Sequence, residues 1–221
     1  MKIGLFDSGI GGTTILESVK QILPQAEYHY IADSKNCPYG EKSDEELEAI
    51  VSKNVEALRD WGADLIVIAC NTATTRCLSF LRDKYPEIPF VGTEPAIKAA
   101  TNTTAKRILV MATPGTIESE RTKMLLEEYQ KPGQKIELLT CLGLADVIEK
   151  YYASHQLSPI IEHLNKLLHE VNIDPEVVVL GCTHYSLIKP EIQTFFKAAT
   201  IIDGNQGVAK QVAKLAQKIA K

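Results

Sequence analysis

The chain has 221 residues, enough for one large α/β domain or for two domains of about 100 residues each. Its composition, 45% hydrophobic and 24% charged, is typical of a soluble globular protein, and a net charge of −4 without a basic stripe argues against nucleic-acid binding. The apolar start at 2–6 is too short for a signal peptide, and no segment approaches the ~18 apolar residues of a membrane span. We therefore expect a cytoplasmic protein with neither a nucleic acid nor a membrane as partner.

Short apolar segments alternate with amphipathic segments along nearly the whole chain. This alternation is typical of α/β units that build a largely parallel sheet, so α/β is the expected fold class. The expected strands, in chain order, are 2–6, 27–32, 64–70, 89–92, 107–112, 136–140, 177–181 and 200–202.

Three amphipathic segments between or after these strands predict helices. In 43–60 the apolar residues fall on one helical face, and Ser43 with Glu46 forms a capping box at its start. The segment 157–172 has the same period, with Ser158-Pro159 as its entry, and a third helix is expected over 205–220.

No linker rich in serine or glycine divides the chain. The best candidate for a domain boundary is the polar run at 101–104, which lies between an alanine-rich helix end and the start of the next strand. We expect two α/β domains over 1–97 and 98–204, with the C-terminal helix 205–221 packing back on the first domain.

Two of the most apolar strands end in a cysteine, Cys70 in the first half and Cys182 in the second. Ligands of open α/β sheets gather at the carboxyl ends of strands, so two thiols there indicate a site closed from both sides. The polar residues that follow are Asn71 and Thr72 after the first cysteine, and Thr183 and His184 after the second. The alternatives are two buried structural cysteines, a Cys/Cys/His metal site that lacks an evident fourth ligand, or a cysteine hydrolase that would leave Cys70 unexplained.

The remaining three cysteines show no metal-ligand spacing. None of the five forms a C-x-x-C pair, and in a cytoplasmic protein all five should be reduced. Cys77 falls in a helix-like stretch and is expected to be a small buried hydrophobic residue, whereas Cys37 precedes the segment 38–40 and could lie near a site.

A glycine-rich turn follows the first strand, as Asp7-Ser8-Gly9-Ile10-Gly11-Gly12. Glycines at a strand-to-helix turn allow close backbone approach and expose amide donors to an anion, so a carboxylate or phosphate could bind here. A dinucleotide-binding turn would need glycine where Thr14 stands, although Asp33 lies at the right distance for a ribose. A nucleotide-binding regulator and a purely structural turn both remain open.

Six ordered segments between residue 3 and about residue 204 together resemble the aspartate/glutamate racemase family, and within it the glutamate racemases. The matching segments are Asp7-Ser8-Gly9-Ile10-Gly11-Gly12, Pro38-Tyr39-Gly40, Ala69-Cys70-Asn71-Thr72, Gly92-Thr93-Glu94-Pro95-Ala96, Ala112-Thr113-Pro114-Gly115-Thr116 and Gly181-Cys182-Thr183-His184-Tyr185.

The resemblance implies two pseudo-symmetric α/β domains with the active site at their interface. It implies an isomerase that interconverts L- and D-glutamate without pyridoxal phosphate or metal. The D-glutamate would be supplied for peptidoglycan, and hence for cell-wall biogenesis and cell shape. The resemblance also implies a homodimer. Glutamate and aspartate differ by one methylene. The residues of the matching segments resemble glutamate racemase more closely than aspartate racemase, which favours glutamate as the substrate.

The resemblance also assigns roles to individual residues. It makes Cys70 and Cys182 the two catalytic bases, with Asp7 supporting the first and His184 the second. Glu149 takes the place of a family glutamate near the second cysteine. The residues that it places around the substrate are Asp7, Ser8, Tyr39, Gly40, Asn71, Thr72, Thr116, Thr183 and His184.

Three features depart from the family pattern. Around Glu149 the family often has prolines where this chain has Leu142 and Asp146, and Ser186 replaces the proline that usually follows the second cysteine motif. The C-terminus also stops earlier than in most members, which could alter domain packing or the dimer contact.

Overall fold

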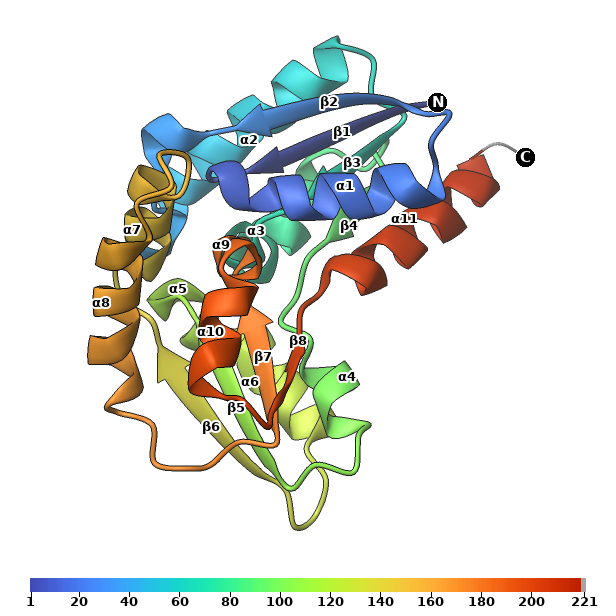
Figure 1. Cartoon of the computed structure of the whole chain (residues 1–221). Helices are drawn as coiled ribbons and strands as arrows, with labels where there is room; N and C mark the ends of the chain where they lie inside the picture. The colour runs from blue at the N-terminus through green and yellow to red at the C-terminus, as the bar shows by residue number, and fades with distance from the viewer. Residues whose placement is uncertain (220–221) are drawn as a thin grey trace.

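The computed structural model describes residues 1–219, which form two four-stranded sheets with all strands parallel (Figure 1). The first sheet has the order β2-β1-β3-β4 and the second has the order β6-β5-β7-β8. The second order repeats the first with every strand number raised by four, so the two halves of the chain have the same topology. The predicted α/β class with two parallel sheets is confirmed.

All eight strands lie where the apolar segments predict them, with ends that differ by at most two residues. The first sheet consists of β1 (Lys2–Asp7), β2 (Glu27–Ala32), β3 (Leu65–Ile68) and β4 (Phe90–Gly92). The second consists of β5 (Arg107–Ala112), β6 (Lys135–Thr140), β7 (Val177–Gly181) and β8 (Thr200–Ile202).

The helices lie mainly between consecutive strands. The α-helices are α1 (Thr13–Ile22), α2 (Asp44–Asp60), α3 (Asn71–Lys84), α4 (Ile97–Thr101), α5 (Pro114–Ile117), α6 (Glu120–Tyr129), α7 (Leu144–Tyr151), α8 (Leu157–Leu168), α9 (Thr183–Leu187), α10 (Lys189–Phe195) and α11 (Asn205–Ile219). Three short 3₁₀ turns precede helices of the first half, namely η1 (Ile10–Gly12), η2 (Ser34–Asn36) and η3 (Tyr39–Glu41).

The predicted helices are confirmed, with one correction at an end. Ser43 and Glu46 make both hydrogen bonds of the capping box that begins α2. Helix α8 ends at Leu168, four residues earlier than the apolar period predicts, because the chain turns there and Val171 bonds back to Leu168. Helix α11 is described to Ile219, so the last predicted residue, 220, lies outside the described part.

Each sheet is covered on both faces, because successive side chains of a strand point to opposite sides. In β5, Leu109 and Met111 pack under α7 to α10, whereas Ile108 and Val110 pack under α4 and α6. The first sheet packs against α2 and α3 on one face and against α1 and α11 on the other. Helix α11 therefore runs beside α1, although it follows the second sheet in the chain (Figure 1).

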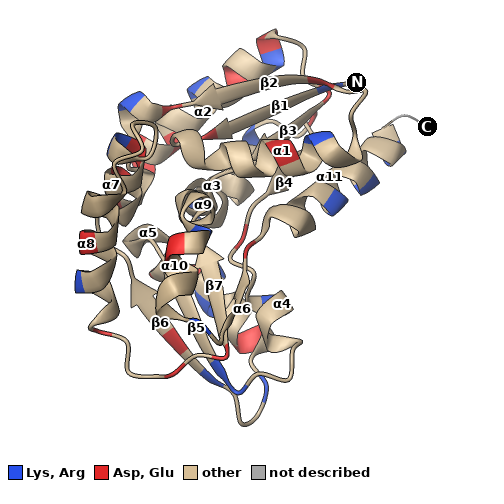
Figure 2. Ribbon diagram, in the orientation of Figure 1, with Lys and Arg blue, Asp and Glu red and all other residues tan. Residues whose placement is uncertain are grey.

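Charged side chains are spread over the outer helices. Figure 2 shows lysines and arginines interspersed with acidic residues in this view, apart from a short row of lysines on α11. Within residues 1–219, no helix combines the length and apolarity that crossing a membrane requires.

Candidate functional site

The two cysteines at strand ends lie at the junction of the two halves. Cys70 follows β3 and is the N-cap of α3, and Cys182 follows β7 and precedes α9. Both side chains are buried, with exposures of 5% and 7%. Because each strand ends at the carboxyl edge of its own sheet, the two thiols reach the junction from opposite sides.

The Cys70 thiol has two hydrogen-bond partners. The backbone N–H of Ala73 donates to its Sγ over 3.5 Å, and the thiol donates to Ser8 Oγ over 3.9 Å. Burial raises the pKa of Cys70 well above its ordinary value of 9.0, and the nearby carboxyl of Asp7 raises it further. The resting form of this group is the thiol.

The Cys182 thiol pairs with its own neighbour in sequence. Its Sγ lies 3.9 Å from Nδ1 of His184, a histidine that is 1% exposed. Burial raises the pKa of Cys182, and Cys70 and Asp7 raise it further by electrostatic repulsion of the thiolate. Since Cys70 is near enough to affect the ionisation of Cys182, the two thiols belong to one site.

Asp7, at the end of β1, joins the two halves beside the thiols. Its Oδ2 accepts hydrogen bonds from Gly12 N at 2.6 Å and from Thr183 Oγ1 at 3.0 Å, and the latter belongs to the second half. Its Oδ1 is buried without a hydrogen-bond partner in the described structure. Burial raises the pKa of Asp7, and the opposing effect of His184 is smaller.

Glu149, on α7, connects His184 to the first half of the chain. Its Oε2 lies 2.8 Å from His184 Nε2 and accepts a hydrogen bond from Ile10 N at 2.9 Å. Its Oε1 accepts a hydrogen bond from Ser34 Oγ. Burial opposes its ionisation, but the hydrogen bonds from His184, Ser34 and Ile10 together lower its pKa.

A cluster of three threonine hydroxyls spans the two halves next to the thiols. Thr72 Oγ1 lies 2.9 Å from Thr113 Oγ1 and 3.3 Å from Thr116 Oγ1, and Thr113 donates to Thr116 over 3.0 Å. Thr72 is the second residue of α3, whereas Thr113 is the N-cap of α5 and Thr116 lies within that short helix. All three are buried.

Tyr39 and Gly40 lie on the turn η3, but the tyrosine hydroxyl does not point to an open position. It donates to Asp33 Oδ2 over 2.7 Å and accepts from Asn54 Nδ2 over 3.0 Å. A Cβ on Gly40 would lie 3.2 Å from Thr113 Cβ, so the glycine allows the turn to approach the threonine cluster.

The amides of the glycine-rich turn bind carboxylates of the chain itself. Gly12 N donates to Asp7 and Ile10 N donates to Glu149, so two of its donors are already used. A Cβ on Gly11 would lie 2.5 Å from His184 N, which explains the glycine by the close approach of α9. Asp33, the candidate ribose partner, is bonded to neighbouring side chains.

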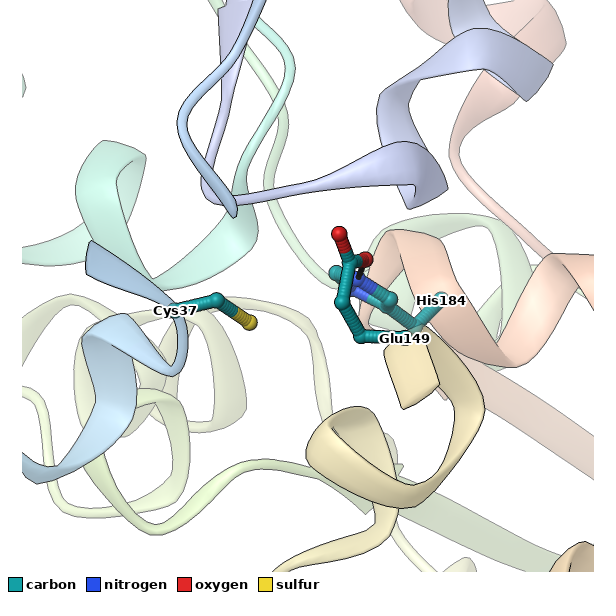
Figure 3. Close-up of side chains that lie close together, drawn as sticks. All are labelled: Cys37, Glu149 and His184. Atoms are coloured by element: carbon teal, nitrogen blue, oxygen red, sulfur yellow. Dashed lines mark hydrogen bonds and ion pairs between the residues drawn. The ribbon is translucent and has the colours of Figure 1, made fainter. Parts of the chain in front are cut away.

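Cys37, which the sequence places beside a possible site, lies next to Glu149 and His184. Figure 3 shows its side chain pointing from the loop after η2 toward Glu149 and His184. One ligand atom from each of the three residues lies within 4.8 Å of the others. Burial raises the pKa of Cys37 to about 12, and Glu149 adds to that effect.

A polar cavity of about 540 Å³ opens beside the threonine cluster. Gly40 and Gly115 line it together with Lys42, Asp44 and Arg76. Its lining comes from both halves of the chain and includes both cations and carboxylates.

The structure thus brings most of the predicted site residues together. Asp7, Ser8, Cys70, Cys182, Thr183, His184 and Glu149 form one connected group, and Thr72 and Thr116 lie in the adjacent threonine cluster. Asn71 is buried at the start of α3. Two further groups join the site without having been predicted. They are Ser34, whose contact with Glu149 has no local signature, and the hydroxyl of Thr113, although that residue stands in a matching segment.

Comparisons with known proteins point to one family. The model of the family described as Asp/Glu/Hydantoin racemase matches residues 13–212. The glutamate racemase of Clostridium acetobutylicum is 38% identical over 218 residues, which are 98% of this chain and 84% of that protein.

Two solved structures extend the comparison to the fold. Escherichia coli glutamate racemase, in complex with L-glutamate and the activator UDP-MurNAc-Ala, has a TM-score of 0.89 at 31% identity, covering 98% of this chain and 82% of that one. Glutamate racemase from Francisella tularensis subsp. tularensis SCHU S4, in complex with D-glutamate, has a TM-score of 0.81 at 27% identity, covering 99% of this chain and 82% of that one.

Proposed function

Because the chain belongs to the Asp/Glu/hydantoin racemase family and is an isomerase of the racemase class, we propose that it interconverts L- and D-glutamate without a cofactor. One observation supports this proposal most strongly. Two buried thiols, one from each half of the chain, lie at the junction, and Cys70 is near enough to raise the pKa of Cys182. Inversion at a tetrahedral carbon needs a proton donor and a proton acceptor on opposite faces, and two such thiols can supply them.

In the proposed reaction one cysteine thiolate removes the α-proton and the other thiol protonates the opposite face. The roles of Cys70 and Cys182 exchange for the other enantiomer. Burial raises the pKa of both thiols, which makes each thiolate scarce but strongly basic, as abstraction of a weakly acidic α-proton requires.

The surrounding polar groups fit an amino-acid substrate. The free Oδ1 of Asp7 is placed to accept a hydrogen bond from the substrate ammonium, which would satisfy the unpartnered oxygen. Neutral donors such as the hydroxyl of Ser8 and the side-chain amide of Asn71 would bind the α-carboxylate and stabilise the negative charge that develops on it. His184, fixed by Glu149, would support proton exchange at Cys182.

Glutamate is the proposed substrate rather than aspartate. The donors near the thiols are mostly hydroxyl and amide groups, which suit a second carboxylate better than an apolar or basic side chain. The methylene that separates the two amino acids is worth only about 1–3 kcal/mol in discrimination. The preference for glutamate therefore rests on the similarity to glutamate racemases.

Solvent exchange at Cα tests both the reaction and the substrate. The protein, purified without added cofactor, is incubated in heavy water with L-glutamate or L-aspartate. We expect loss of the Cα proton signal together with decay of optical rotation to zero, with a higher kcat/KM for glutamate. No decay with either amino acid would contradict the racemase assignment, and faster exchange with aspartate would contradict the substrate alone.

The biological role proposed is supply of D-glutamate for peptidoglycan, in the cytoplasm, where free thiols stay reduced. Expression in a bacterium that depends on added D-glutamate should restore growth without it, and the Cys70→Ala variant should not. The homodimer implied by the family stays a prediction that light scattering of the purified protein can check.

A further inference from the structure

Three side chains of different ligand chemistry converge beside the proposed catalytic thiols. Cys37 comes from the loop between η2 and η3, Glu149 from α7 and His184 from α9 (Figure 3). They offer a sulfur, a carboxylate oxygen and an imidazole nitrogen within 4.8 Å of one another. This donor set suits zinc, whereas calcium and magnesium prefer oxygen ligands alone.

Two of the three ligands are held in place before any ion binds. Glu149 receives hydrogen bonds from Ser34 and Ile10 N, and His184 is almost fully buried. Such outer contacts orient the ligands of protein metal sites. The ring nitrogen of His184 that faces Cys182 would remain outside the coordination shell.

The distances require only small movements of Cys37 and Glu149. Zinc bonds of about 2.0–2.3 Å place tetrahedral ligand atoms about 3.3–3.6 Å apart. The ligand atoms of this cluster lie within 4.8 Å of one another, so the widest separation exceeds this range by about 1 Å at most, whereas the 2.8 Å between Glu149 Oε2 and His184 Nε2 is about 0.5 Å too short. Cys37 is half-buried on an irregular loop and can move toward the ion, and a small rotation of the Glu149 carboxylate lengthens its contact with His184.

We propose that Cys37, Glu149 and His184 bind one Zn²⁺ ion, with water at the fourth position, and that the bound ion inhibits the enzyme. The ion would occupy Nε2 of His184, which stops the imidazole from taking up a second proton beside Cys182, and it would join the Cys37 loop of the first half to α7 and α9 of the second. Since binding needs only these three side chains, it does not depend on the proposed reaction.

The first test measures zinc binding by competition with a chromophoric chelator. The wild-type protein should bind one Zn²⁺ per chain, and Cys37→Ala and Cys37→Ser should weaken binding at least tenfold. Cys77→Ala, which removes a buried thiol on α3, and Cys70→Ala, which removes a proposed catalytic thiol, should bind zinc as the wild type does. Circular dichroism of each variant checks that the fold is retained.

A second measurement identifies the ligands directly. Co²⁺ bound in place of zinc should give a thiolate charge-transfer band that is present in the wild type and in Cys70→Ala but absent in both Cys37 variants. Zinc should inhibit the wild type at concentrations at least tenfold lower than those that inhibit Cys37→Ala. The proposal is overturned if wild type binds no zinc, or if removal of the Cys37 thiol leaves affinity and cobalt spectrum unchanged.

Discussion

Cys70 and Cys182 occupy equivalent positions in the two halves but have different hydrogen-bond partners. Cys70 faces the hydroxyl of Ser8, whereas Cys182 faces the imidazole of His184. The second thiol thus has a titratable neighbour that can exchange its proton, and the first has only the more distant influence of Asp7. The two halves of the proposed reaction are therefore chemically unequal.

Removal of either thiol should stop racemisation. Cys70→Ala and Cys182→Ala each leave one face of the substrate without a proton donor or acceptor, and kcat/KM should fall by about 10²–10⁴-fold. Cys77→Ala is the matched control, because this buried thiol lies farther along α3, in the core of the first half. Near-wild-type turnover in both directions by either site variant would show that the two-thiol mechanism is wrong.

The buried carboxyl of Asp7 should make stability depend on pH. Its folded-state pKa is raised above the ordinary 3.8, so the folded protein binds this proton more tightly than the unfolded chain. The contribution of Asp7 to stability is therefore present below pH 3.8 and is lost as pH rises through the folded-state pKa. Asp7→Asn keeps an acceptor for Gly12 N and has no proton to lose.

Urea unfolding at several pH values from about 4 to 8 measures this effect. The free energy of unfolding of the wild type, minus that of Asp7→Asn, should decrease as pH rises above about 4 and then level off. Parallel curves for the two proteins over the whole range would mean that burial does not raise the Asp7 pKa.

At the scale of elements, the turn η1 packs closely against the second half of the chain. Helix α9 of the second half lies so near it that a Cβ on Gly11 would be 2.5 Å from His184 N and 2.7 Å from Thr183 Oγ1. Backbone atoms cannot yield without moving the whole helix. The glycine-rich turn therefore sets the distance between Cys182 and the first half.

Gly11→Ala should separate η1 from α9 and so impair the site. A displacement of about 1 Å can reduce activity by about 10²-fold, and we expect a loss of kcat/KM of this size together with a lower melting temperature. Gly207→Ala on α11 is the control, since a Cβ there meets no atom within 4 Å. This control should keep full activity and gain about 0.5 kcal/mol from helix propensity. Full activity of Gly11→Ala would contradict the proposed fit.

At the scale of the whole molecule, the two sheets have the same strand order, and the carboxyl ends of their strands face the junction between the halves. Helix α11 packs back on the first sheet. Hydrogen bonds join the halves around the thiols, among them Thr183 to Asp7, Ser34 and Ile10 N to Glu149, and Thr72 to Thr113. Such contacts stabilise a closed arrangement in which the chemistry is protected from water.

The reaction should be insensitive to removal of cofactors. No lysine stands in the segments that resemble the family, so nothing there could form a Schiff base with pyridoxal phosphate. Dialysis against a chelator and treatment with hydroxylamine should leave kcat unchanged or, where zinc inhibits, raise it. Loss of activity that pyridoxal phosphate or a metal restores would overturn the proposed mechanism.

The sequence by itself determined the eight strands, the class of fold and the two thiols at strand ends. It could do so because these features have local causes: apolar runs of strand length, helical periodicity, the Ser43–Glu46 capping box and glycines at a turn. The ordered segments that resemble the family also predict that Cys70 and Cys182 belong to one site, because they place both thiols among residues of a shared pattern.

Only the tertiary structure decided which groups surround the thiols. The contact between Ser34 and Glu149 joins residues 115 positions apart, and that between Ile10 N and Glu149 joins residues 139 apart. No periodicity or turn pattern encodes such pairs, because they arise when two separately patterned halves pack together. The same packing brings Cys37 to Glu149 and His184, so the proposed zinc site exists only in the folded chain.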